Sequence, residues 1–241
     1  MDDLWLWLAV LLAGPVGSFL AVWAERSCDG RSLSAPSACT GCGRRLAARD
    51  LIPVVSFLLR RRRCRYCGTA LPWRLLAAEV LAIAAALAAI VVTETWPGLA
   101  LTLGYLWLLL ALGVTDLICL RLPDVMTGLL FALGLGLAWL DGRGPGNALV
   151  GGAIGAVTLL ALRWGYQGLR GREGLGLGDV KLAAGIGAGL GVLALPWVGL
   201  LASLAGLAAA ALGVFGRANR DTPLPFGVFL CAAAGLVLLW R

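Results

Sequence analysis

The stretch GLALTLGYLWLLLALGVTD, residues 98–116, decides the fold of this chain. The 18 residues before Asp116 carry no charge, and about 20 apolar residues are enough for one helix across a bilayer. The stretch then ends in a carboxylate. A carboxylate in a membrane helix costs roughly 2.5 to 3.5 kcal/mol unless it is paired, hydrated or functional. The stretch therefore predicts a membrane helix that ends in a functional acidic side chain.

The rest of the chain has a similar composition. Of its 241 residues, 60% are hydrophobic and 14% are charged, and several of the ten tryptophans lie near the ends of apolar runs, where a membrane interface favours them. The fold class is therefore an all-α polytopic membrane protein of about eight transmembrane helices. The hydropathy pattern places these helices at residues 4–24, 75–92, 98–115, 125–140, 146–162, 180–195, 197–215 and 225–240.

Two of these segments need a separate argument. The run 4–24 lacks a basic preceding region and a small-residue cleavage site, so we expect a retained helix and not a signal peptide. The uncharged stretch 182–216 is too long for one span, and we expect Pro196 and nearby glycines to split it. Glycines in the run 185–191 also put small residues on a helix face, which permits close approach of a neighbouring helix.

The basic residues indicate the orientation. Residues 25–74 form a polar insert with eleven arginines, and in the eight-helix arrangement only Arg143 and Arg241 fall on the opposite side. The positive-inside rule then places the insert in the cytoplasm. Asp116 and Asp179 fall on the cytoplasmic side as well. Besides the arginines of the insert, the basic residues on that side are Arg121, Arg163, Arg170, Arg172, Lys181, Arg217 and Arg220.

The expected domains follow from this pattern: a first helix at 1–24, the insert at 25–74, and a membrane core of about seven helices at 75–241. Within the insert, two C-x-x-C pairs are separated by 21 residues, and each is followed by glycine. This spacing predicts a zinc-ribbon-like site with four thiolates and a structural zinc ion. Disulfides are the alternative, which a reducing cytoplasm disfavours. The four predicted ligands are Cys39, Cys42, Cys64 and Cys67.

Other features of the sequence are less specific. Cys28, Cys119 and Cys231 have no C-x-x-C partner, and we interpret each as a small apolar filler. The arginine run at residues 60–63 could contact nucleic acid or anionic lipid head groups, but we favour a solvated topology signal. We expect membrane lipids, and no nucleic acid, among the partners.

The chemistry of the chain is limited by its side chains. It has no histidine, which excludes Ser-His-Asp and Cys-His catalysis and every histidine metal site. Asp116 and Asp179 are the candidate catalytic pair. Two carboxylates about 3 Å apart cannot both stay ionised, so such a pair shares one proton. The ionised member can activate water against a peptide carbonyl, and the protonated member can protonate the leaving nitrogen.

Several neighbours are candidates for supporting this pair. Gly176 and Gly178 precede Asp179 and permit backbone conformations and close approaches that larger residues resist. Asp124 follows Pro123, and it is either the N-cap of the next helix or a supporting acid. Lys181 lies two residues after Asp179, so it points away from it on a regular helix, and we expect it to reach toward lipid head groups.

Motifs along most of the chain resemble those of the bacterial type IV prepilin peptidases, which are GxGD aspartic peptidases. They follow the family's order from Gly17 to Phe229. The motifs are Gly17-Ser-Phe-Leu20, Cys39-x-x-Cys42, Asp50-Leu-Ile-Pro53, Cys64-Arg-x-Cys67, Glu79, Asp116 to Leu122-Pro-Asp124, Gly176-x-Gly-Asp179-Val-Lys181-Leu and Pro225-Phe-Gly-Val-Phe229.

The resemblance implies an intramembrane-type aspartic endopeptidase with Asp116 and Asp179 in the catalytic positions. Such enzymes cut the leader of type IV prepilins or type II secretion pseudopilins after a glycine, on the cytoplasmic side. Many members then N-methylate the new amino terminus with S-adenosylmethionine, and the cysteine insert accompanies this bifunctional form. Glu79 occupies one of the family's motif positions and is expected to be a further supporting residue. The resemblance also implies a location in the bacterial inner membrane.

Three departures from the family pattern keep one alternative open. Ala21 and Leu51 stand where the family often has Asn, and Arg74-Leu-Leu stands where Arg-Tyr-Pro is common. A peptidase without methyl transfer is therefore the first alternative. A proton-coupled transporter would more often place its aspartates near mid-membrane. A zinc-ribbon membrane scaffold would explain the insert but not the two aspartate motifs.

Overall fold

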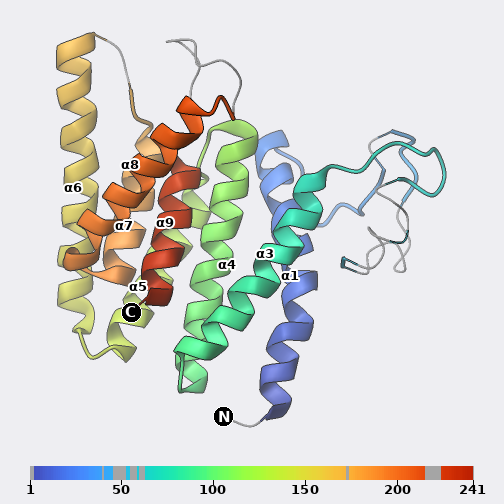
Figure 1. Cartoon of the computed structure of the whole chain (residues 1–241), viewed down its shortest axis with the longest axis horizontal. Coiled ribbons are helices and arrows are strands. Elements are labelled where there is room, and N and C mark those ends of the chain that lie inside the picture. Colours follow the sequence, from blue (N-terminus) through green and yellow to red (C-terminus); the bar gives the residue numbers. More distant parts are fainter. Residues whose placement is uncertain are drawn as a thin grey trace.

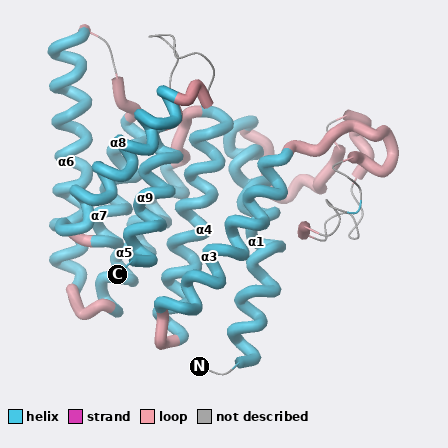
Figure 2. Tube along the Cα trace, in the orientation of Figure 1, coloured by secondary structure: helices cyan, strands magenta, loops and turns pink. Residues whose placement is uncertain are grey.

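The computed structural model describes residues 3–39, 41–45, 53–54, 59, 63–171, 174–214 and 224–240. Within these ranges the chain is almost entirely helical, with two isolated antiparallel bridges in the insert, so the all-α prediction is confirmed. Eight helices of 14 residues or more account for it (Figures 1 and 2). They are α1 (Asp3–Asp29), α3 (Trp73–Val92), α4 (Trp96–Cys119), α5 (Asp124–Leu140), α6 (Gly144–Arg170), α7 (Leu177–Leu190), α8 (Leu195–Ala211) and α9 (Phe226–Trp240).

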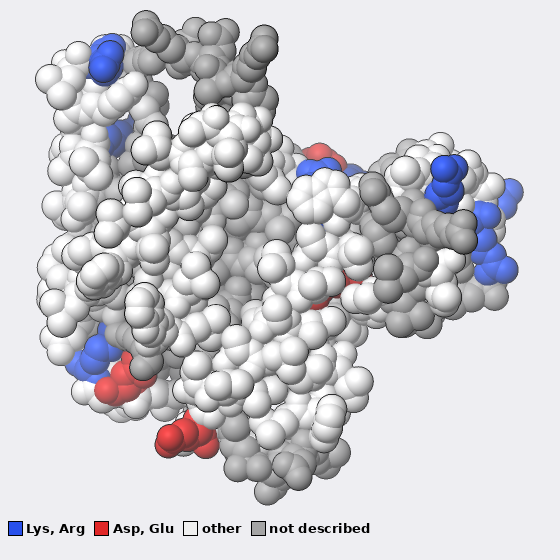
Figure 3. Space-filling view, in the orientation of Figure 1, with Lys and Arg blue, Asp and Glu red and all other residues white. Residues whose placement is uncertain are grey.

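The protein is a multi-pass membrane protein. Five segments of the described chain are long and apolar enough to cross a bilayer, four of them in α1, α3, α4 and α6, and the fifth formed by a short 3₁₀ helix (Val192–Ala194) and α8. Helices α5, α7 and α9 have 17, 14 and 15 residues and are shorter than a full span. Figure 3 shows a broad uncharged band across the visible face, with most of the visible basic side chains at the insert and the upper end.

Several helices extend beyond the ranges expected from hydropathy. Helix α1 continues to Asp29, and α6 continues to Arg170, because a helix persists into its polar flank while hydropathy marks only the apolar part. As a result, Arg163 lies inside α6 and not at its end. The expected break before α8 is present, but it begins at Gly191, whose φ of +82° ends α7, and Pro196 lies in the first turn of α8.

Glycines bring the helices of the core into backbone contact, as the small-residue pattern predicts. A Cβ on Gly187 would meet the backbone of Gly151 on α6, and a Cβ on Gly134 of α5 would lie 2.7 Å from the backbone nitrogen of Gly189. Helix α7 is therefore enclosed by α5, α6 and α9. This packing fixes the position of its first turn, which carries Asp179.

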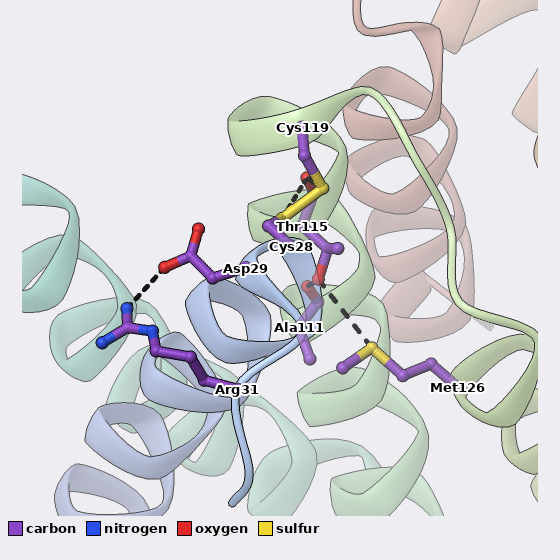
Figure 4. The surroundings of a disulfide bond; sticks show 7 residues. All are labelled: Cys28, Asp29, Arg31, Ala111, Thr115, Cys119 and Met126. Atoms are coloured by element: carbon purple, nitrogen blue, oxygen red, sulfur yellow. Dashed lines mark hydrogen bonds and ion pairs between the residues drawn. A yellow bond between two sulfur atoms is a disulfide. The ribbon is translucent and has the colours of Figure 1, made fainter.

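One prediction about the cysteines is wrong. Cys28, near the end of α1, and Cys119, at the end of α4, form a disulfide whose Cα atoms are 5.8 Å apart (Figure 4). The pairing was missed because both residues lie beyond the helix ends expected from hydropathy. Cys231 is 5% exposed within the apolar core, in agreement with a filler role.

Candidate functional site

Asp116 lies in the last turn of α4 and is buried, with 5% of its surface exposed. Its Oδ2 atom accepts a hydrogen bond of 3.1 Å from the backbone N–H of Val228. Val228 belongs to the first turn of α9, where backbone N–H groups have no partner within the helix. The start of α9 therefore supplies a donor to a carboxylate that is 112 residues away in sequence.

Asp179 lies in the first turn of α7 and is partly buried. Its Oδ2 atom accepts a hydrogen bond of 3.3 Å from the N–H of Gly176, the residue before the helix. Gly178 lets the Leu122 segment approach, because a Cβ on Gly178 would lie 3.0 Å from the Leu122 Cβ. Gly176 has an ordinary φ of −73°, so its role here is the amide that it offers to Asp179.

The two carboxylates meet at Gly227, in the first turn of α9. A Cβ on Gly227 would lie 2.9 Å from Oδ2 of Asp116 and 3.3 Å from Oδ1 of Asp179. Only a residue without a side chain leaves this space free between the two acids. Sequence reasoning did not assign Gly227 or Val228 to the site, although both lie in the motif Pro225-Phe-Gly-Val-Phe229.

A polar cavity of about 310 Å³ opens beside the two aspartates. Besides the two aspartates, its charged lining residues are Arg121, which precedes α5, Asp124 at the start of α5, and Lys181 on α7. The lining residues are Asp116, Leu120, Arg121, Leu122, Asp124, Gly176, Leu177, Gly178, Asp179 and Lys181.

Asp124 and Lys181 form an ion pair at the rim of this cavity. The Lys181 Nζ lies 2.5 Å from Oδ1 of Asp124, and both side chains are at least half exposed. The N-cap of α5 is Pro123, so Asp124 is the first helical residue and makes no side-chain capping bond. We expected Lys181 to reach toward lipid head groups, and in the structure its ammonium group instead joins α7 to the start of α5.

Glu79 lies elsewhere, on α3, and does not line this cavity. Its Oε2 atom accepts a hydrogen bond of 2.7 Å from the backbone N–H of Val54, and Glu79 itself is 7% exposed. Pro53 packs against Gly14 of α1, where a Cβ would lie 2.9 Å from the proline ring. Glu79 therefore holds one turn of the insert against the α1–α3 pair. Asp50, in the same motif, lies outside the described residues.

The four cysteines of the insert come together as one cluster. Their Sγ atoms all lie within 4.8 Å of one another, and those of Cys39 and Cys67 are 3.7 Å apart. A tetrahedral site with metal–sulfur bonds of about 2.3 Å separates its sulfurs by roughly 3.8 Å, so the cluster could hold a metal ion. The Thr69 hydroxyl hydrogen-bonds to Cys67 and lowers the pKa of that thiol to about 6, which favours the thiolate that a metal requires.

The two halves of this cluster have the same local structure. In each, the first cysteine donates its N–H to a carbonyl five residues on, and a backbone N–H two residues on points at its sulfur. Gly43 and Gly68, directly after the second cysteines, have φ values of +68° and +72°. These are left-handed conformations that favour glycine. Of the arginine run 60–63, only Arg63 is described, and it forms a bridge with Ala70.

Comparisons with known proteins identify the families that this sequence matches. Residues 11–93 match the bacterial peptidase A24 N-terminal domain, and residues 103–211 match the type IV leader peptidase family. The match to the second model includes Asp116 and Asp179, and the match to the first includes the four cysteines. No solved structure is a significant match to the chain.

Three curated relatives illustrate the similarity, each named prepilin leader peptidase/N-methyltransferase. The protein from Aeromonas salmonicida (strain A449) is 38% identical over 207 residues, which cover 85% of this chain and 71% of the relative. The Dickeya chrysanthemi protein is 41% identical over 216 residues (84% and 73%), and the Dichelobacter nodosus protein is 36% identical over 207 residues (85% and 71%). Because these matches cover most of the chain at this identity, the chain belongs to the type IV leader peptidase family.

Proposed function

We propose that this protein is a membrane aspartic endopeptidase that removes the leader of type IV prepilins or type II secretion pseudopilins, cutting after a glycine. The observation that carries the proposal is the meeting of Asp116 and Asp179 at Gly227, beside a polar cavity. Two acids from α4 and α7 that share one small space are the machinery of metal-independent peptide hydrolysis. Residues 75–241 carry this activity in our proposal, and residues 25–74 carry the metal-binding insert.

In the proposed mechanism, the two carboxylates share one proton. The ionised member accepts a proton from water, whose oxygen attacks the scissile carbonyl, while the protonated member donates to the carbonyl oxygen. The leaving nitrogen then takes a proton from the pair, and the peptide bond breaks. The N–H of Val228 holds Oδ2 of Asp116, which is also the oxygen nearest Gly227. The N–H of Gly176 holds Oδ2 of Asp179 and leaves its Oδ1 facing Gly227.

We further propose that the cavity beside the two aspartates opens at the cytoplasmic face of the inner membrane. In the described part of the chain, the insert, the end of α4 and the start of α7 share one end of the bundle, and most of the visible basic side chains lie there or at the insert (Figures 1 and 3). The start of α6, where Arg143 is the N-cap, lies at the opposite end (Figure 1). The positive-inside rule assigns the basic end to the cytoplasm. A substrate leader that carries basic residues would stay on that side.

Zinc is the metal that we propose for the four-cysteine cluster. Cys39, Cys42, Cys64 and Cys67 fit the softness and the geometry that zinc prefers, and four thiolates leave no open position for substrate. A zinc ion held there would stabilise the fold of the insert. Glu79 clamps the insert onto α3, so an ordered insert would in turn support the α1–α3 side of the bundle.

Methyl transfer to the new amino terminus, with S-adenosylmethionine as donor, is the second activity that we propose. The relatives' names include it, and the match to the amino-terminal family domain covers the insert. A peptidase without methyl transfer is the alternative, because three motif positions of this region differ from the common pattern. Glu79, the acidic group buried in this region, already accepts a hydrogen bond from Val54, so we assign no residue to the donor.

A membrane cleavage assay tests the proposal. The full chain is co-expressed with a prepilin, alongside Asp116→Asn, Asp179→Asn and, as a matched control, Asp29→Asn, which removes an exposed acid at the same end of the bundle. Mass spectrometry of the product should show cleavage after glycine by the wild type and the control only. An added methyl group would support the second activity. Cleavage by either site variant would contradict the aspartyl mechanism.

A further inference from the structure

Arg163 is a buried cation outside the aspartate cavity. It hydrogen-bonds to a peptide unit that also hydrogen-bonds to Asp179. Arg163 lies on α6 and is 9% exposed, which is unusual for an arginine. Its Nη1 atom donates a hydrogen bond to the carbonyl oxygen of Leu175, in the segment that leads from α6 to α7. The arginine therefore holds the chain directly before the Gly176-Leu-Gly178-Asp179 motif.

The Leu175 carbonyl and the Gly176 N–H belong to the same peptide unit. This N–H is the group that donates to Oδ2 of Asp179 at 3.3 Å. Because a peptide unit is planar, fixing the direction of its carbonyl also fixes the direction of its N–H. Arg163 on one side and Asp179 on the other are thus joined by a single rigid group.

The chemistry of these two hydrogen bonds favours the same arrangement. A bond from a guanidinium is charge-assisted and stronger than one between neutral groups. Hydrogen bonds in series polarise one another, so the cation on the carbonyl strengthens the N–H as a donor to a carboxylate. Close packing at Gly174 also restricts the segment between α6 and α7, because a Cβ on Gly174 would lie 2.5 Å from the ring of Tyr166 on α6.

We propose that Arg163 is a positioning residue for Asp179: through the 175–176 peptide it aims the Gly176 N–H at the carboxylate and so holds Asp179 in place opposite Asp116. Arg163 is not among the described residues that line the cavity, so its proposed effect is exerted through Asp179. This inference rests on the proposed peptidase function. It adds a side chain from α6 to a site that otherwise draws on α4, α7 and α9.

The experiment measures the kinetics of purified full-length protein on a prepilin substrate for Arg163→Leu, Arg163→Gln and Arg163→Lys. Arg170→Leu is the matched control, since it removes the same charge from an exposed position two turns along α6. We expect Arg163→Leu to lower kcat about 100-fold, as for a small misplacement of a reacting group, while KM changes less than about threefold. Arg163→Lys should retain more kcat than Arg163→Gln, and Arg170→Leu should match the wild type.

A second measurement does not depend on activity. Amide hydrogen exchange of residues 174–179, followed by mass spectrometry in the same purified protein, should be faster in Arg163→Leu than in wild type and unchanged in Arg170→Leu. If Arg163→Leu does not fold, the same comparison is made between Arg163→Lys and Arg163→Gln. Wild-type kcat or wild-type exchange in a folded Arg163→Leu protein would overturn the proposal. A wild type that does not cleave, with exchange as expected, would instead count against the peptidase function.

Discussion

The cysteine cluster of the insert and the aspartate pair of the bundle differ in how they are assembled. Each half of the cysteine cluster is a short loop whose own backbone orients its sulfurs, with a left-handed glycine directly after the second cysteine. The aspartate pair instead needs three helices, because Asp116, Asp179 and the intervening Gly227 come from α4, α7 and α9. The same local loop occurs twice in the insert, and the two loops form one cluster, whereas the aspartate pair exists only in the packed bundle.

This difference implies different sensitivities. A local site tolerates changes elsewhere in the protein but not the loss of one of its own ligands. A site between helices is sensitive to any atom that separates the helices, including atoms on residues with no chemical role. The largest effects on cleavage should therefore come from packing at the pair, and smaller ones from the insert and the rim.

Among variants that keep both aspartates, Gly227→Ala should have the largest effect on cleavage. The added methyl group would stand 2.9 Å from Oδ2 of Asp116, tighter than real Cβ contacts, so the two acids would have to separate. We expect prepilin cleavage to fall at least about 100-fold. Gly235→Ala is the control on the same helix, because its Cβ would make an ordinary 3.5 Å contact with Leu106. Normal cleavage by a folded Gly227→Ala protein would contradict the bundle geometry.

Cys64→Ser should affect the metal far more than the cleavage reaction. Loss of one buried thiolate should reduce the bound zinc from one ion per chain to nearly none. Elemental mass spectrometry measures this zinc content. The insert should become sensitive to limited proteolysis, while cleavage falls by no more than about tenfold, because the metal lies outside the aspartate cavity. Cys231→Ser, which alters a cysteine of the bundle, should leave the zinc content unchanged. Complete loss of cleavage with an intact insert would show that the two sites are not separable.

The Cys28–Cys119 disulfide is a covalent connection between the helix that leads into the insert and the helix that carries Asp116. A reducing environment would open this bond. We expect Cys28→Ser to lower the midpoint of thermal unfolding by roughly 5 to 10 °C in oxidised protein. The midpoint should not change in protein kept reduced, and cleavage should change little in either state. An equal shift in both states would mean that packing, and not the bond, is responsible.

The Lys181–Asp124 pair should have the smallest effect. Both side chains are at least half exposed, so the coupling between them should be about 0.2 to 1 kcal/mol. In a double-mutant cycle of Lys181→Ala and Asp124→Ala, that coupling is a factor of at most about five in cleavage rate. The effect should shrink further at high salt. A much larger coupling would indicate that one of these residues takes part in the reaction.

The features that sequence could predict are those with a local signal. Apolar runs identified the helices and the two acids that lie near their ends, and the C-x-x-C spacing identified the four cysteines that cluster in the insert. The role of Gly227 could not be predicted, because it depends on where α9 meets α4 and α7. The Lys181–Asp124 pair was missed because spacing within one helix says nothing about a partner on another. The disulfide was missed because hydropathy does not record how far a helix continues into its polar flank.

The shortness of α7 has a consequence for the biosynthesis of the protein. A helix of 14 residues is about 21 Å long, whereas the hydrocarbon core of a bilayer is about 30 Å thick. Nine of its residues are buried against other helices, so α7 is suited to neighbours and not to lipid. A nascent chain would thus gain little by releasing α7 into the membrane alone. The acid that it carries would reach its place only after the flanking helices have emerged from the ribosome, so the translating cell would hold no active enzyme until nearly the whole chain has been made.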